Sequence, residues 1–495
     1  MEVAVTGALF LLWVLFIFIS HSLKMYKEKS QLPPGPTPWF FLGNLLQKDV
    51  MPLNKNYSKL VEKYGPMFTI WMGPKPMVVL CGFDVVKDAL VDHAEAFGGR
   101  IHSPIIDRVT KGHGIINSSD IEWRELRRFT VMTLRDFGMG KRSMSERVQE
   151  EAVCLVEALA ATKGQGFDPT TRITSAVSNV ISSVIFGTRF DYADKTFLKH
   201  QRIIENEVGL FRTILGLLYS AVPKILDCFP GRHQKIFSDC DELCAFVREN
   251  VKVHMQTLDP QNIRDYIDCF LIKSEKEQRS ASDTFRTENL VMTVFGLFVA
   301  GTGTTSFALI SGLMVMAKLP HIQAKVQQEI DEVMSATRAP SMEDRVRMPF
   351  TNAVIHEILR YPPSINETIP RTMSCDTKFR GFTFPKGTAV APMFTTVHRD
   401  PLQWETPEQF NPGHFLDVKG QFKKKDALIA FSAGKRACVG EALARMELFL
   451  FFSTLLQNFT FQLVGAAKDM DLASLFTEFR AKNVSPLMKA TRRSM

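Results

Sequence analysis

The sequence predicts a mainly α-helical protein with small β-sheets, preceded by an N-terminal transmembrane helix. Three observations carry this prediction. Residues 3–20 are almost wholly apolar, which is long enough to cross a hydrocarbon core of about 30 Å as a helix. Residues 290–317 form the longest uncharged run of the chain. Apolar residues bounded by Gly-Pro or Pro-Lys-Gly turns near 67–80 and 378–390 predict short strands.

Composition bounds the functional classes. The chain has 495 residues, of which 45% are hydrophobic, and this is ordinary for a globular protein with a large core. Its net charge of +8 fits an acidic protein partner or anionic lipid. The sequence has no basic tract with interleaved aromatic residues that would indicate binding to nucleic acid. None of the eight cysteines has zinc-site spacing.

The N-terminus predicts a retained membrane anchor at residues 1–21. Lys24, Lys27 and Lys29 follow the apolar run and no basic residue precedes it, so the rest of the chain should stay cytoplasmic. A cleaved signal peptide would need a charged n-region and a small-residue cleavage site, which are missing. Residues 22–36 read as a basic and proline-rich linker, and residues 37–495 as one catalytic domain.

A cysteine loop at residues 431–440 is the most informative motif. Cys438 lies between Gly434 and Gly440, and an apolar run with helical spacing begins at Glu441. Backbone N–H groups and the dipole at a helix N-terminus favour a thiolate, while the glycines allow positive φ and close approach of the backbone to a flat group. A lone cysteine is more often a buried structural residue. The full pattern Phe-x-x-Gly-x-Arg-x-Cys-x-Gly instead favours a thiolate ligand to haem iron.

This loop resembles the haem-binding loop of the cytochrome P450 superfamily, and further motifs match in order, most like vertebrate microsomal family-two enzymes. The resemblance implies the cytochrome P450 fold, with haem b between a long central helix and the proximal cysteine loop. Cys438 would be the axial iron ligand. The other implied cofactor-binding residues are Arg100, Trp123, Arg127, Ala300, Gly301, Arg371, Phe431, Gly434, Arg436 and Gly440.

The run 290–317 is then interpreted as this central helix. A membrane span there would separate Trp123 and Arg127 from Cys438, so one haem could not meet both. The segment 300–305 resembles the family's oxygen-binding groove, which makes Thr304 the implied catalytic residue that delivers protons. The family usually has an acid just before this threonine, whereas this chain has Gly303. Proton delivery would then depend on water, or be slower and less well coupled.

Two further groups follow from the resemblance. Glu357 and Arg360 lie on one helical face and match the family's Glu-x-x-Arg lock, with His414 in the later partner segment. The implied apolar substrate pocket has core packing as its alternative explanation, and it comprises Phe295, Phe298, Ile365, Ile369 and Phe476.

The implied activity is hydroxylation or epoxidation of small apolar substrates such as xenobiotics, fatty acids or steroids, with O₂ and electrons from NADPH. NADPH–cytochrome P450 reductase would deliver the electrons, with cytochrome b5 as a second donor, at the endoplasmic reticulum membrane. A basic face for this docking would comprise Lys423–Lys425, Lys435, Arg124, Arg128 and Arg445, with a solvated charge run as the alternative. The rival functions are a haem-thiolate isomerase or peroxygenase that needs no reductase, and a haem sensor or carrier.

Overall fold

The computed structural model describes residues 25, 30–40, 42–139, 142–210, 214–277, 284–334, 338–362, 369–482 and 485–493. The predicted anchor, most of the basic part of the linker, and Ile365 lie outside these residues. The chain divides into two compact units. The sheet unit comprises the described residues within 1–101, 368–400 and 433–436, and the helical unit comprises those within 102–367, 401–432 and 437–495.

A five-stranded sheet organises the sheet unit. Its strands, in spatial order, are β1 (Met67–Met72), β2 (Lys75–Leu80), β8 (Ala389–Pro392), β5 (Arg371–Thr372) and β3 (Gly99–Arg100). β2 and β8 are parallel, and the other neighbours are antiparallel. The predicted hairpin at 67–80 is confirmed, with a two-residue turn in which Gly73 has φ 63°. This unit also contains α2 (Leu53–Tyr64), α3 (Phe83–Lys87), α17 (Phe394–His398) and the hairpin β6 (Thr377–Phe379) and β7 (Phe382–Phe384).

The helical unit contains most of the chain. Its helices are α4 (Pro104–Thr110), α5 (Gly114–Asn117), α6 (Asp120–Asp136), α7 (Arg142–Ala160), α8 (Thr170–Ile185), α9 (Lys195–Leu210), α10 (Ile214–Ala221), α11 (Pro223–Leu226), α12 (Arg232–Thr257), α13 (Tyr266–Glu277), α14 (Thr287–Lys318), α15 (Pro320–Val333), α16 (Pro349–Arg360), α18 (Glu441–Asn458) and α19 (Leu472–Lys482). A small sheet has the order β4 (Gly166–Phe167), β10 (Met488–Arg492) and β9 (Phe459–Leu463). The predicted mainly helical class with small sheets is therefore confirmed.

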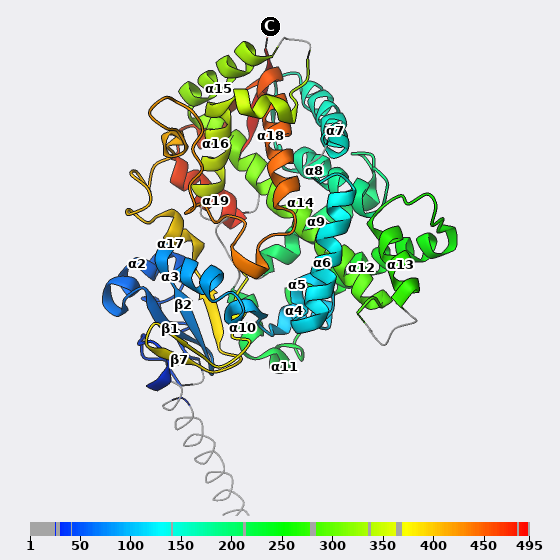
Figure 1. Cartoon of the computed structure of the whole chain (residues 1–495). Helices are drawn as coiled ribbons and strands as arrows, with labels where there is room; N and C mark the ends of the chain where they lie inside the picture. Colours follow the sequence, from blue (N-terminus) through cyan, green and yellow to red (C-terminus); the bar gives the residue numbers. More distant parts are fainter. Residues whose placement is uncertain are drawn as a thin grey trace, which may run out of the picture. The chain divides into compact units, whose positions relative to one another are not determined.

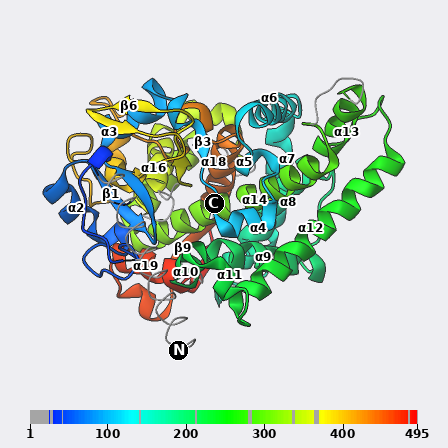
Figure 2. The ribbon, with the colours of Figure 1, turned by 90° about the horizontal axis from the view of Figure 1, so that it is seen from below.

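The central element of the helical unit is α14, which packs against α5, α8, α12 and α18 (Figures 1 and 2). Glycines allow its neighbours to approach. A Cβ on Gly296 would lie 2.9 Å from Ile116, one on Gly301 3.1 Å from Ile181, and one on Gly312 2.8 Å from Ile358. Among the described residues α14 is the one helix long and apolar enough to span a membrane. In its most apolar 18-residue stretch, 67% is buried inside the protein. The prediction of a core helix, rather than a second span, is confirmed.

Candidate active site

Cys438 lies in the turn before α18 in the helical unit. Its backbone N–H donates to the Phe431 carbonyl oxygen over 2.8 Å, and its side chain is exposed. Protein atoms that exclude water raise the pKa of the thiol. Hydrogen bonds from the backbone N–H groups of Gly440 and Glu441, together with the charge of Arg127, lower this pKa but do not outweigh the desolvation by the surrounding protein atoms. The expected effect of the helix N-terminus is present, but it does not determine the direction in which the pKa of Cys438 shifts.

Gly434 is the glycine of the loop whose position leaves no room for a side chain. It has φ +70°, and a Cβ there would lie 1.7 Å from the Leu90 carbonyl oxygen within the sheet unit. Leu90 belongs to the short π-helix Asp88–Asp92. Gly440 instead has φ −93°. Only Gly434 combines a left-handed backbone with close approach to another segment.

We expect the substitution Gly434→Ala to destabilise the protein more than Gly420→Ala. Both positions have positive φ, which costs an alanine roughly 1–2 kcal/mol. No atom of the described residues lies within 4 Å of a Cβ on Gly420, so this position reports the backbone strain alone. At Gly434 the clash with a backbone carbonyl adds about 1–3 kcal/mol of overpacking. Thermal unfolding of the two variants measures the difference, and an equal loss of Tm would contradict the close-approach argument.

Trp123 and Arg127 on α6 lie one turn apart, as their spacing predicts. The Arg127 guanidinium lies over the Trp123 ring, 5.7 Å from its centroid. Its Nη2 donates to the Ala437 carbonyl oxygen over 2.7 Å, which brings it beside the residue that precedes Cys438. Burial lowers the pKa of Arg127, and the nearby Cys438 opposes this shift. Arg127 therefore places a positive charge next to the thiol.

Three arginines gather at the β3 edge of the five-stranded sheet. Arg100 on β3 is the register partner of Arg371 on β5. Nε of Arg436 donates to the Gly98 carbonyl over 2.9 Å, and Arg371 Nη2 lies 3.4 Å from the Ala433 carbonyl. Arg371 and Arg436 are 2% and 5% exposed. Charged guanidinium groups brought together in this way are suited to binding carboxylates.

Ala300 and Thr304 form an exposed strip on α14, one turn apart, in a region where Phe298, Thr302 and Thr305 are buried. The Thr304 hydroxyl donates to the Ala300 carbonyl over 2.8 Å. Gly301 faces α8 through Ile181 instead. A ligand on this strip would meet the Thr304 hydroxyl and the Ala300 methyl group in the middle of α14.

The predicted substrate-pocket residues are not all brought to this strip. Phe295 and Phe298 are buried, and Phe298 packs edge-on against Phe186. With helical spacing they lie about 180° and about 120° around α14 from Thr304. Phe476 is buried against Tyr361 in the helical unit. Ile369 belongs to the sheet unit and is 41% exposed. The two α14 phenylalanines therefore have a core-packing explanation.

Glu357, Arg360 and His414 form one buried network. Arg360 binds Glu357 through two hydrogen bonds of 2.6 and 2.8 Å, and both side chains are fully buried. The same guanidinium donates to the carbonyls of Pro407 and Gln409. Burial opposes ionisation of Glu357, but the Arg360 and His414 hydrogen bonds and the Asn411 N–H outweigh it and hold its pKa below the ordinary value. The network joins the end of α16 to the segment 407–414.

Sequence reasoning missed Glu447 on α18. It is 2% exposed and hydrogen-bonded to Thr305, and burial raises its pKa well above the ordinary value. This buried carboxyl lies beside Thr305, the residue that follows Thr304. An acid inside the apolar run 446–452 was the available sequence signal.

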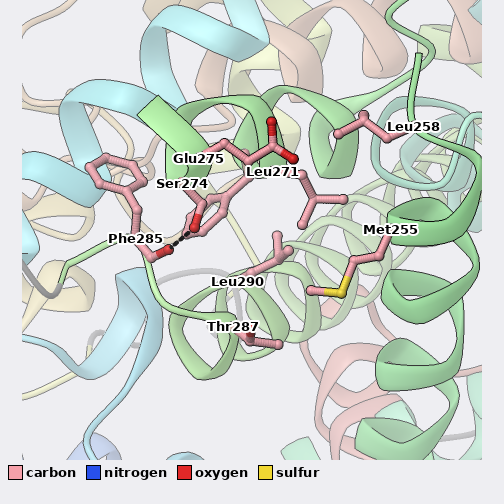
Figure 3. Close-up of a pocket in the computed structure, with 9 residues that line it drawn as sticks. Met255, Leu258, Leu271, Ser274, Glu275, Phe285, Thr287 and Leu290 are labelled. Carbon is pink, nitrogen blue, oxygen red and sulfur yellow. Dashed lines mark hydrogen bonds between the residues drawn. The ribbon is translucent and has the colours of Figure 1, made fainter. Parts of the chain in front are cut away.

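A separate cavity of about 200 Å³ lies between the end of α12, α13 and the start of α14 (Figure 3). Ser274 Oγ donates to the Phe285 carbonyl on one wall. None of the predicted site residues that the structure describes lines it; its residues are Met255, Leu258, Phe270, Leu271, Ser274, Glu275, Phe285, Thr287 and Leu290. The cavity is therefore distinct from the exposed strip on α14.

Comparison with known proteins identifies the family. The cytochrome P450 family model matches residues 33–478. Cytochrome P450 2C23 of Rattus norvegicus is 47% identical over 91% of both chains, and cytochrome P450 2C8 of Homo sapiens is 47% identical over 90% of this chain and 91% of its own. Cytochrome P450 2B4 of Oryctolagus cuniculus is 45% identical over 93% of both chains. The chain belongs to the cytochrome P450 family, the haem-iron oxidoreductases of the monooxygenase class.

Proposed function

We propose that this chain is a haem-thiolate monooxygenase that hydroxylates or epoxidises small apolar substrates, namely xenobiotics, fatty acids or steroids. The observation that carries the proposal is the exposed Cys438 thiol, held by backbone N–H groups and flanked by Arg127. A cysteine with these neighbours is suited to ligating iron as a thiolate.

The predicted cofactor-binding residues of each unit carry groups that suit haem b. In the helical unit, Cys438 would ligate the iron, Trp123 and Arg127 would take a propionate, and Phe431, Ala300, Gly301 and Gly440 would border the ring. In the sheet unit, Arg100, Arg371 and Arg436 supply guanidinium donors for carboxylates, and Gly434 sets the path of the loop. When bound, the haem supplies the iron chemistry that activates O₂, for which thiolate donation favours O–O cleavage.

Thr304 would hold and pass on the protons that the reaction consumes. Its hydroxyl is exposed and hydrogen-bonded to its own helix at Ala300. Rotation about χ1 frees this hydroxyl to donate toward the exposed side of α14. Gly303 brings no acid to this step, so water must bring the proton to Thr304. An apolar substrate lying along the exposed strip of Ala300 and Thr304 would exclude bulk water.

We expect Gly303→Glu to couple NADPH consumption more tightly to product formation, with less hydrogen peroxide released. The site has room, because among the described residues a Cβ on Gly303 would meet only Ile204, at 3.9 Å. A carboxylic acid there would supply a proton donor next to Thr304. Product and peroxide per NADPH measure this effect. Gly303→Gln is the matched control, with the same length but no ionisable group, and an equal improvement in both variants would contradict the proton-donor argument.

The electron donor would dock on exposed cations of the helical unit. Arg124, Arg128, Lys423 and Lys424 are exposed and suit an acidic partner such as NADPH–cytochrome P450 reductase or cytochrome b5. Lys435 forms an ion pair with Glu95 in the sheet unit. Residues 1–21 would anchor the protein in the endoplasmic reticulum membrane, with 22–36 as linker and 37–495 as a cytoplasmic catalytic domain. The resemblance of its motifs to those of microsomal family-two enzymes supports this location.

Oxygen consumption that depends on NADPH and reductase, with product and peroxide quantified, tests the proposal. Turnover with both supports a monooxygenase. Gly303 favours one second candidate, an isomerase or peroxygenase that needs no reductase; turnover with peroxide alone, or isomerisation without any electron donor, would support it. Absence of all turnover in haem-loaded protein would instead favour a sensor or carrier.

A further inference from the structure

Arg445 on α18 differs from the exposed cations of the docking face, although the sequence groups it with them. Its Nε donates to Glu441 Oε1 over 2.8 Å, and its Nη1 lies 3.0 Å from His356 Nε2. Its guanidinium also lies over the Phe431 ring, 4.8 Å from the centroid. Only 20% of the side chain is exposed. Arg445 is therefore held inside the helical unit by an acid, an imidazole and an aromatic ring.

His356 on α16 is built to receive Arg445 as an uncharged ring. Its Nδ1 lies 2.7 Å from the Asn352 carbonyl oxygen, which can only accept, so Nδ1 carries the proton. Nε2 is then left with a lone pair for the Arg445 guanidinium. The ring is 5% exposed and lies 4.5 Å from the Phe422 ring. Burial, together with nearby cations, lowers its pKa to about 3. His356 thus anchors Arg445 without repelling it at neutral pH.

Two of the contacts of Arg445 lead directly to Cys438. The carbonyl of Phe431 accepts the backbone N–H of Cys438, so fixing Phe431 fixes the partner of that N–H. The backbone N–H of Glu441 donates to the cysteine sulfur, whereas the Glu441 carboxylate opposes negative charge on that sulfur. Arg445 pairs with this carboxylate and so offsets its field at the thiolate.

We propose that Arg445, anchored by neutral His356, is a positioning residue for the Cys438 loop: it neutralises Glu441 and braces Phe431, and thereby sets the reduction potential of the thiolate-ligated iron. The proposal rests on the function proposed above. Without Arg445, the unpaired carboxylate beside the thiolate disfavours adding an electron to the iron, so the potential falls. A residue that only docks the electron donor would leave the potential unchanged.

The test is a reductive titration of the purified full-length, haem-loaded protein, read as the midpoint potential. Arg445→Met is expected to shift the midpoint to more negative values, and Arg445→Lys, which keeps the charge, to shift it less. Arg445→Met combined with Glu441→Gln should return toward the wild-type value, because the unpaired carboxylate is gone. Arg124→Met, at an exposed docking position, is the matched control and should leave the midpoint unchanged while raising the KM for the reductase.

Two results would overturn the inference. One is an unchanged midpoint in Arg445→Met; the other is a double variant that shifts as far as the single one. If Arg445→Met does not fold, Glu441→Gln alone tests the proposal. Removing this carboxylate, which is 41% exposed, should move the midpoint potential to more positive values. An unchanged midpoint potential in Glu441→Gln would refute the proposal. The red-shifted absorption of the reduced carbon monoxide complex distinguishes failure of the proposed function from failure of this inference. If wild-type protein lacks this absorption, thiolate ligation itself is refuted. If the absorption is present but the midpoint potential does not change in the variants, only the role of Arg445 is refuted.

Discussion

Cys438→Ala should abolish the red-shifted absorption of the reduced carbon monoxide complex and all monooxygenase turnover. The substitution removes the one side chain that the loop presents as an iron ligand, with its N–H donors from Gly440 and Glu441. No other side chain in that hydrogen-bonded position can donate electron density as a thiolate does. Absorption spectra of the oxidised and the reduced, carbon monoxide-bound protein measure ligation, and NADPH-dependent product formation measures turnover.

Cys375→Ala is the matched control for this experiment. Cys375 is also an exposed free cysteine, and it lies in the sheet unit, so its loss should leave both spectrum and turnover intact. Circular dichroism should show that Cys438→Ala retains its helices, because the side chain contributes little to the core. A Cys438→Ala protein that kept the thiolate-type spectrum would contradict ligation by this residue.

Local sequence patterns were sufficient to predict several elements. The uncharged run at 290–317 predicts α14, whereas its core position was expected from the resemblance, which implies that Trp123, Arg127 and Cys438 meet one haem. The Gly73-Pro74 turn between apolar runs predicts the β1–β2 hairpin. These features depend on neighbours in sequence, so the pattern carries the information.

Other features depend on partners that are distant in sequence. Position 434 must be glycine because a Cβ there would meet the Leu90 carbonyl. His356 can anchor Arg445 only because the fold brings these two residues together. The direction of the Cys438 pKa shift depends on how much water the folded chain excludes, which the motif does not reveal. Apolar composition also does not tell which face of α14 a phenylalanine occupies, so Phe295 and Phe298 read equally as pocket or as core.

The second large effect is expected for Arg360→Met, which leaves the fully buried Glu357 carboxylate without its bidentate partner. Removing one partner of a buried pair costs about 3–5 kcal/mol, because the remaining charge stays desolvated. Thermal or urea unfolding of the purified variant measures the loss. Arg142→Met is the matched control: the Arg142–Glu146 pair has a similar 3.0 Å contact but is 86% and 55% exposed, so its loss should cost at most about 1 kcal/mol.

The pH dependence and a double variant identify the source of the loss. In wild type the pKa of Glu357 is lowered, so its contribution to stability is present above the unfolded pKa and disappears as pH falls through the folded value. In Arg360→Met burial is less well opposed, the pKa of Glu357 rises, and protonation relieves the penalty. The stability gap between the two proteins should therefore be largest at neutral pH and narrow on acidification. Arg360→Met with Glu357→Leu should recover part of the loss. If the double variant is no more stable than the single, the carbonyls of Pro407 and Gln409, which lose the same guanidinium, account for the cost instead of the stranded carboxylate.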